Sequence, residues 1–82
     1  MEEVITDQDA KHVIAHNVTI LLADRGWSQN FLAKKTEETR MTISRICRAE
    51  NMPGAGILAR IAEAFEVSVD ELFRPIPKKS RR

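Results

Sequence analysis

Residues 27–48 read WSQNFLAKKTEETRMTISRICR, and this segment indicates the architecture of the whole chain. Ser28 and Thr39 are residue types that cap the N-termini of helices, and apolar residues recur at helical spacing after each of them. The segment therefore predicts two short helices, one from Ser28 to about Lys35 and one that begins after Thr39.

The two predicted helices share a buried side. Leu32, Ile43 and Ile46 are spaced to pack into a core, and we expect Phe31 to be buried with them. Ala33 is small at the point where the second helix crosses close to the first. The opposite face of the second helix carries arginine, methionine, threonine and serine side chains. A helix with such a face fits the width of the DNA major groove.

A long helix is predicted before this pair. It begins at a cap on Thr6 and ends near Arg25, where Gly26 can stop it. At about 100° per residue, its apolar side chains fill one broad arc. The members of this arc are Val13, Ile14, Val18, Ile20, Leu21 and Leu22.

Two more helices are predicted after the pair. Pro53, Gly54 and Gly56 interrupt the chain before a fourth helix. The apolar residues of this helix are Ile57, Leu58, Ile61, Ala62 and Phe65. Ser68 and Glu71 form a capping box for a last short helix. The predicted fold class is all-α, a compact domain of five helices.

The composition agrees with a small cytoplasmic domain. The chain has 82 residues, of which 43% are hydrophobic and 5% aromatic, so we expect one domain and no all-β fold. The single Cys47 cannot build a disulfide framework, and we expect it to be a small buried apolar side chain beside Ile46. No apolar run approaches the roughly 20 residues of a membrane-spanning helix. We therefore expect a cytoplasmic protein with no membrane partner.

Signs of a catalytic or metal site are few. His12 and His16 stand four residues apart, a spacing that lets two imidazoles share a metal ion, but only Asp9 is a local candidate for a third ligand. No Ser/His/Asp arrangement and no glycine-rich phosphate loop is present in the sequence. Trp27 precedes the cap Ser28, where we expect it to pack in the core. The sequence predicts no enzyme, no metal site and no cofactor.

The combined pattern resembles a known family. The motifs SQNFLA and TISRI, followed by ILARIAEAFEVSVDELF, span about residues 14–73 and resemble the Cro/XRE-type helix-turn-helix family, which includes the lambda and 434 repressors. The resemblance implies a lambda repressor-like domain whose helix-turn-helix consists of the second and third helices. It also implies a transcriptional regulator, a repressor of prokaryotic or phage origin. Such a protein reads a pseudo-palindromic operator in double-stranded DNA as a homodimer, using residues 39–48 in the major groove.

The resemblance also implies a role for individual residues. Those implied to read bases are Thr39, Arg40, Met41 and Arg45. Those implied to contact phosphates are Gln29, Lys35, Thr42, Ser44 and Arg48. An arginine can bond guanine O6 and N7 together, which is worth about 1–3 kcal/mol of discrimination, and a methionine can contact a thymine methyl.

Several residues depart from the family pattern. Glu37 stands where glycine is usual, because the backbone there prefers a positive φ, and Ala49 replaces the glycine that often follows the third helix, so that we expect a less sharp exit. Glu38 and Thr36 stand where larger apolar residues are common. The glutamate pair either repels DNA or points away and stabilises the N-terminus of the recognition helix. We favour the second reading because helix N-termini attract anions.

Charge divides the chain into segments. We expect a flexible acidic N-terminus over residues 1–5, a helix-turn-helix domain over 6–73 and a basic, disordered tail over 74–82. An alternative function is an antitoxin or protein-interaction module that has a toxin or another protein as partner and binds DNA weakly or not at all. Glu37, Glu38 and the acidic segment 49–73 favour this alternative.

A dimer contact is also predicted near the end of the last helix. The residues predicted to form it are Val69, Phe73 and Ile76.

Overall fold

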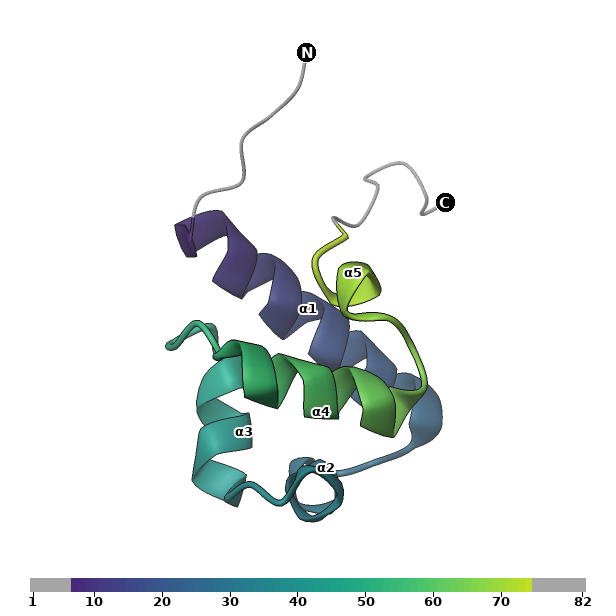
Figure 1. Cartoon of the computed structure of the whole chain (residues 1–82). Helices are drawn as coiled ribbons and strands as arrows, with labels where there is room; N and C mark the ends of the chain where they lie inside the picture. The colour runs from purple at the N-terminus through teal and green to yellow at the C-terminus, as the bar shows by residue number, and fades with distance from the viewer. Residues whose placement is uncertain (1–6, 75–82) are drawn as a thin grey trace.

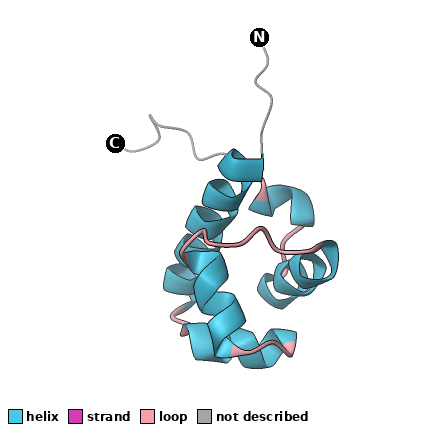
Figure 2. Ribbon diagram, turned by 90° about the vertical axis from the view of Figure 1, so that its left-hand side faces the viewer, coloured by secondary structure: helices cyan, strands magenta, loops and turns pink. Residues whose placement is uncertain are grey.

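Five helices and their connecting loops make up residues 7–74, the part of the chain that the computed structural model describes. In chain order they are α1 (Asp7–Arg25), α2 (Gln29–Thr36), α3 (Arg40–Cys47), α4 (Ala55–Phe65) and α5 (Val69–Leu72). α2 contacts α3 and α4, α3 packs on α1, and α5 rests on α1 and α4 (Figure 1). Figure 2 shows helices and loops but no strand in these residues. The predicted five-helix, all-α fold is confirmed.

The predicted helix starts are confirmed at three sites. The side chains of Ser28, Thr39 and Ser68 accept hydrogen bonds from the backbone N–H three residues later, at 3.0, 3.1 and 3.1 Å. Each bond satisfies one of the free N–H groups in a first helical turn. Gly54 is the N-cap of α4, so Gly56 lies inside this helix and not before it. The predicted cap Thr6, residues 1–5 and all of the predicted tail except Arg74 lie outside the described residues.

The first four helices end in the same way. A left-handed residue stands just past each helix: Gly26 (φ 69°), Glu37 (61°) and Glu66 (63°) follow their helices directly, whereas Ala49 (60°) comes one residue later, after Arg48. The next N–H then bonds a carbonyl five residues earlier, at 2.8–2.9 Å in all four cases. This motif closes helix C-termini. The expected loose exit after Ala49 is therefore wrong, because alanine adopts the conformation that glycine usually supplies.

Replacing Ala49 with glycine should stabilise the fold. A left-handed backbone costs an L-residue about 1–2 kcal/mol that glycine does not incur, although glycine also loses more entropy on folding. We expect a net gain of about 0.5–1 kcal/mol, seen as a rise of several degrees in the melting temperature by circular dichroism. Ala59→Gly, on the exposed face of α4, is the matched control and should lower the melting temperature. A lower melting temperature in both variants would contradict the conclusion that the left-handed backbone at residue 49 is strained for alanine.

All five helices contribute to one hydrophobic core. Its members are Ile14, Val18, Leu22, Leu32, Ala33, Ile43, Ile46, Leu58, Ile61, Ala62, Phe65 and Leu72. Most of the predicted apolar positions are therefore confirmed. Within residues 7–74 no helix is both long and apolar enough to cross a membrane.

Two predicted core residues are exposed. Phe31 is 44% exposed because Trp27, which packs in the core as predicted, stacks on Phe65 at 5.2 Å and leaves Phe31 against its ring edge at 4.9 Å. Ile20 is 46% exposed because the buried face of α1 is narrower than the apolar arc. Asn17 is buried on that face instead.

Asn17 joins α1 to the end of α5. Its Nδ2 donates to the carbonyl oxygens of Leu72 at 2.8 Å and Arg74 at 3.0 Å, and more weakly to Glu71 at 3.4 Å. The carbonyls of Glu71 and Leu72 end α5, and that of Arg74 follows it, where no further turn supplies N–H partners. A buried asparagine therefore fastens the short α5 to the rest of the domain. Sequence patterns alone assigned Asn17 no role.

Candidate nucleic-acid interface

α3 is anchored on one side and exposed on the other. Ile43 and Ile46 are 0% and 2% exposed in the core, whereas Met41 is 57% exposed and the side chains of Arg40 and Arg45 are also exposed. Within residues 7–74, the guanidinium groups of these two arginines form no hydrogen bond or ion pair. α3 thus presents two arginines and a methionine to solvent on a rigid support.

A shallow hollow follows this exposed face. The residues that line it are Arg40, Met41, Ser44 and Arg48. The fold therefore brings together four of the residues assigned from the sequence, two as base readers and two as phosphate contacts. Arg45, also exposed on α3, does not line this hollow.

The two threonines at the start of α3 are occupied by capping. The Thr39 hydroxyl accepts from the backbone N–H of Thr42 at 3.1 Å and bonds the Thr42 hydroxyl at 3.0 Å. Thr39 is exposed and Thr42 is half-buried. Their hydroxyls therefore define the N-terminus of α3 and lie at the end of the helix where anions are favoured.

Arg48 is engaged at the other end of α3. Its Nη1 donates to Ser44 Oγ at 2.6 Å, and its Nε donates to Glu50 Oε2 at 2.8 Å. The hydrogen bond from Arg48, with a smaller contribution from the charge of Arg45, holds the pKa of Glu50 below its ordinary value. Glu50 was not assigned a role from the sequence. An acidic residue two positions after a predicted phosphate contact is the signal that could have identified it.

The turn between α2 and α3 is tied to α4. Arg60 Nε donates to the Thr36 carbonyl at 3.0 Å, and Arg60 Nη2 forms an ion pair with the carboxylate of Glu38. The Thr36 hydroxyl is fully buried and donates to the carbonyls of Leu32 at 2.8 Å and Ala33 at 3.2 Å. Glu38 is thus held by α4 and pairs with neither exposed arginine of α3. Its partner is Arg60, which neither sequence interpretation of the glutamate pair identified.

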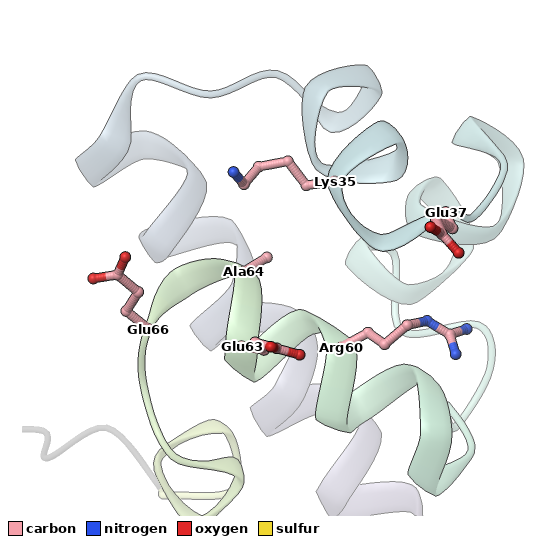
Figure 3. A pocket seen from close by; sticks show the side chains of 6 residues that line it. All are labelled: Lys35, Glu37, Arg60, Glu63, Ala64 and Glu66. Carbon is pink, nitrogen blue, oxygen red and sulfur yellow. The ribbon is translucent and has the colours of Figure 1, made fainter.

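Lys35 lies apart from the exposed face of α3. Its Nζ sits over the rings of Trp27 and Phe31, at 5.4 and 5.6 Å from their centroids. It lines a second hollow, which α2 and the following turn share with α4 (Figure 3). The residues of this hollow are Lys35, Glu37, Arg60, Glu63, Ala64 and Glu66. Gln29, the first residue of α2, is half-buried.

The two histidines and the cysteine considered in the sequence lie outside the exposed face of α3. His12 and His16 are exposed on α1, and no group of three potential metal ligands occurs in the described part of the chain. Cys47 packs against the core as predicted, but it is half-buried and not fully buried. Burial raises the pKa of its thiol, and a hydrogen bond with Thr19 offsets part of this rise.

Comparison with known proteins identifies the same helix-turn-helix fold. A helix-turn-helix family model matches residues 20–72. The crystal structure of a hypothetical transcription factor, NHTF, from Neisseria superposes with a TM-score of 0.80 at 26% identity, over 96% of this chain and 90% of that one. The solution structure of the SOS-response transcriptional repressor LexA from Eubacterium rectale shares the fold, with a TM-score of 0.76 at 19% identity over 89% and 85% of the two chains. Among curated protein sequences, none matches. From the family match and the geometry of α2 and α3, the chain belongs to the Cro/C1-type helix-turn-helix family.

Proposed function

We propose that this protein is a sequence-specific transcriptional regulator, a repressor, that binds double-stranded DNA with α3 in the major groove. Family membership supports DNA binding, and the similar Neisseria protein is described as a hypothetical transcription factor. The observation that carries the proposal is the exposed face of α3, where Arg40, Met41 and Arg45 have free access to solvent. A helix anchored by its apolar side and open on its polar side is the geometry that reads base edges.

The proposed contacts divide into two kinds. Arg40 and Arg45 each bond a guanine, Met41 meets a thymine methyl, and Thr39 reads a base at the entry of α3. The phosphate contacts are Gln29, Lys35, Thr42, Ser44 and Arg48. Phosphate contacts position the protein and make its affinity dependent on salt, whereas base contacts confer sequence preference.

Selection of bound sequences from a pool of random duplexes tests this function. We expect enrichment of one site with two-fold symmetry, and retardation of that site in a gel at low salt. Electrostatic binding is strongest at low salt, so the absence of any retardation there would contradict DNA binding. That result would favour the alternative of an antitoxin or protein-interaction module.

Homodimerisation through α5 is part of the proposal. Val69 is 38% exposed, and Phe73 is half-buried at the end of the same short helix. Ile76, the third residue predicted for this contact, lies outside the described residues. A two-fold dimer would place its two α3 helices about 34 Å apart, one turn of B-DNA. This spacing matches a pseudo-palindromic operator.

Val69→Glu should separate the dimer. A carboxylate buried in an apolar contact without a partner is costly, so we expect the dimer dissociation constant to rise by about tenfold or more. Light scattering with size exclusion measures the mass at several concentrations. Ala59→Glu, on the exposed face of α4, adds the same charge elsewhere and should leave the mass unchanged. Equal behaviour of the two variants would place the dimer contact away from α5.

A further inference from the structure

Three polar side chains form a cluster at the C-terminal end of α3, next to its exposed face. Arg48 bonds Ser44 at 2.6 Å and Glu50 at 2.8 Å. The side chains of Arg48 and Glu50 are 56% and 48% exposed, so this ion pair faces solvent. The cluster includes two residues, Ser44 and Arg48, that are proposed to contact phosphate. The cluster therefore lies where the DNA backbone would pass.

The position of Glu50 is unfavourable for α3 itself. The last turn of a helix carries a partial negative charge, so a carboxylate beside it is repelled. The backbone N–H of Glu50 closes the helix by bonding the Arg45 carbonyl at 2.9 Å, but any residue except proline could supply that bond. Helix stability thus gives no reason for a carboxylate at this position. The one hydrogen bond that its carboxylate forms among the described residues is with Arg48.

We propose that Glu50 competes with DNA phosphate for Arg48 and so limits the affinity of the protein for DNA of any sequence. This inference rests on the proposed function. A carboxylate and a phosphate bind a guanidinium group through the same kind of charge-assisted hydrogen bond. The Glu50 carboxylate holds the Nε–H of Arg48 and offsets its charge, so a phosphate meets only the remaining Nη donors of a partly neutralised group unless it displaces the carboxylate.

The exposure of the pair determines the size of the effect. Exposed ion pairs are weak and easily exchanged, so Glu50 lowers the affinity without preventing binding. Arg48 is proposed to contact phosphate and no base, so the effect is the same on every sequence. Binding to random DNA is reduced as much as binding to an operator. Glu50 thus sets the affinity of the protein while α3 sets its sequence preference.

Glu50→Gln tests this role by removing the charge and keeping the shape. The probe is a fluorescently labelled duplex of random sequence at low salt, read by anisotropy, which requires no known operator. We expect Glu50→Gln to bind about two- to fivefold more tightly than the wild type. Asp24→Asn is the matched control, because it removes the same charge from an exposed residue of α1 that has no proposed contact with DNA or with a second copy. Its affinity should change by less than about 1.5-fold.

The decisive comparison repeats Glu50→Gln in an Arg48→Ala background. Competition predicts that most of the gain disappears there, because no guanidinium remains to be released. An equal gain with and without Arg48, or an equal gain in Asp24→Asn, would overturn the competition and leave DNA binding intact. A wild-type protein that fails to bind the random duplex at low salt would instead overturn the proposed function itself. Thermal melting of each variant shows that the fold is unchanged.

Discussion

Asn17→Ala is expected to lower the free energy of unfolding by about 2–3 kcal/mol, because it removes the donor that serves the end of α5. The carbonyl of Leu72 lies in a buried hydrogen bond, and it would lose this partner without gaining water. For a domain of this size, such a loss lowers the melting temperature by roughly 10–20 °C. Thermal unfolding followed by circular dichroism measures it.

Two further variants test whether the loss of stability comes from the hydrogen bonds of Asn17 and not from substitution in α1 as such. His16→Ala changes the exposed neighbour on α1 and should leave the melting temperature within a few degrees of the wild type. Asn17→Asp keeps the shape but replaces the donor with a carboxylate, which faces carbonyl oxygens and should destabilise at least as much as alanine. Its deficit relative to the wild type should shrink on acidification, since protonation restores one donor. A small loss in Asn17→Ala would mean that water replaces the amide.

Local chemistry made most of the fold predictable. Ser28, Thr39 and Ser68 start helices through contacts that reach only three residues along the chain. The apolar spacing of Ile43 and Ile46 likewise identified the buried side of α3, and so its exposed side. Such features depend on helical periodicity, which a sequence shows directly.

The features that sequence patterns missed depend on partners far away in the chain. Asn17 bonds carbonyls 54 to 57 residues away, and Glu38 pairs with Arg60, 22 residues away. Phe31 is exposed because Trp27 occupies the place against Phe65. In each case a polar or aromatic side chain finds its partner only when distant parts of the chain pack together. A periodic pattern shows which face of a helix is apolar, but not which of two candidates fills a site.

The same distinction applies to the candidate interface. The exposure of Arg40, Met41 and Arg45 followed from their place on α3, opposite Ile43 and Ile46. Lys35 was assigned a phosphate contact by resemblance, and it lies over aromatic rings beside α4, apart from the exposed face of α3. The position of a residue on α3 therefore predicted whether its side chain reaches solvent. The neighbours of Lys35 could not be predicted in this way, because they depend on how α4 packs beside α2.

Arg45→Ala should weaken binding to the selected operator by about 5- to 150-fold, the equivalent of about 1–3 kcal/mol for one lost bidentate contact with guanine. Binding to a random duplex should change far less, because no base contact is lost there. Competition anisotropy with both duplexes measures the ratio of the two affinities. Arg45 is exposed and its guanidinium bonds no described residue, so the fold should be unaffected.

Arg48→Ala is the matched control for this prediction, since it removes an arginine one turn further along the same helix. It should weaken binding to operator and random DNA alike, and reduce the slope of log affinity against log salt by about 0.9. The two substitutions are therefore distinguished by the ratio of operator affinity to random-duplex affinity, which Arg45→Ala should lower and Arg48→Ala should leave unchanged. If Arg45→Ala also weakened both duplexes equally, Arg45 would be a phosphate contact, and sequence preference would rest on Arg40 and Met41.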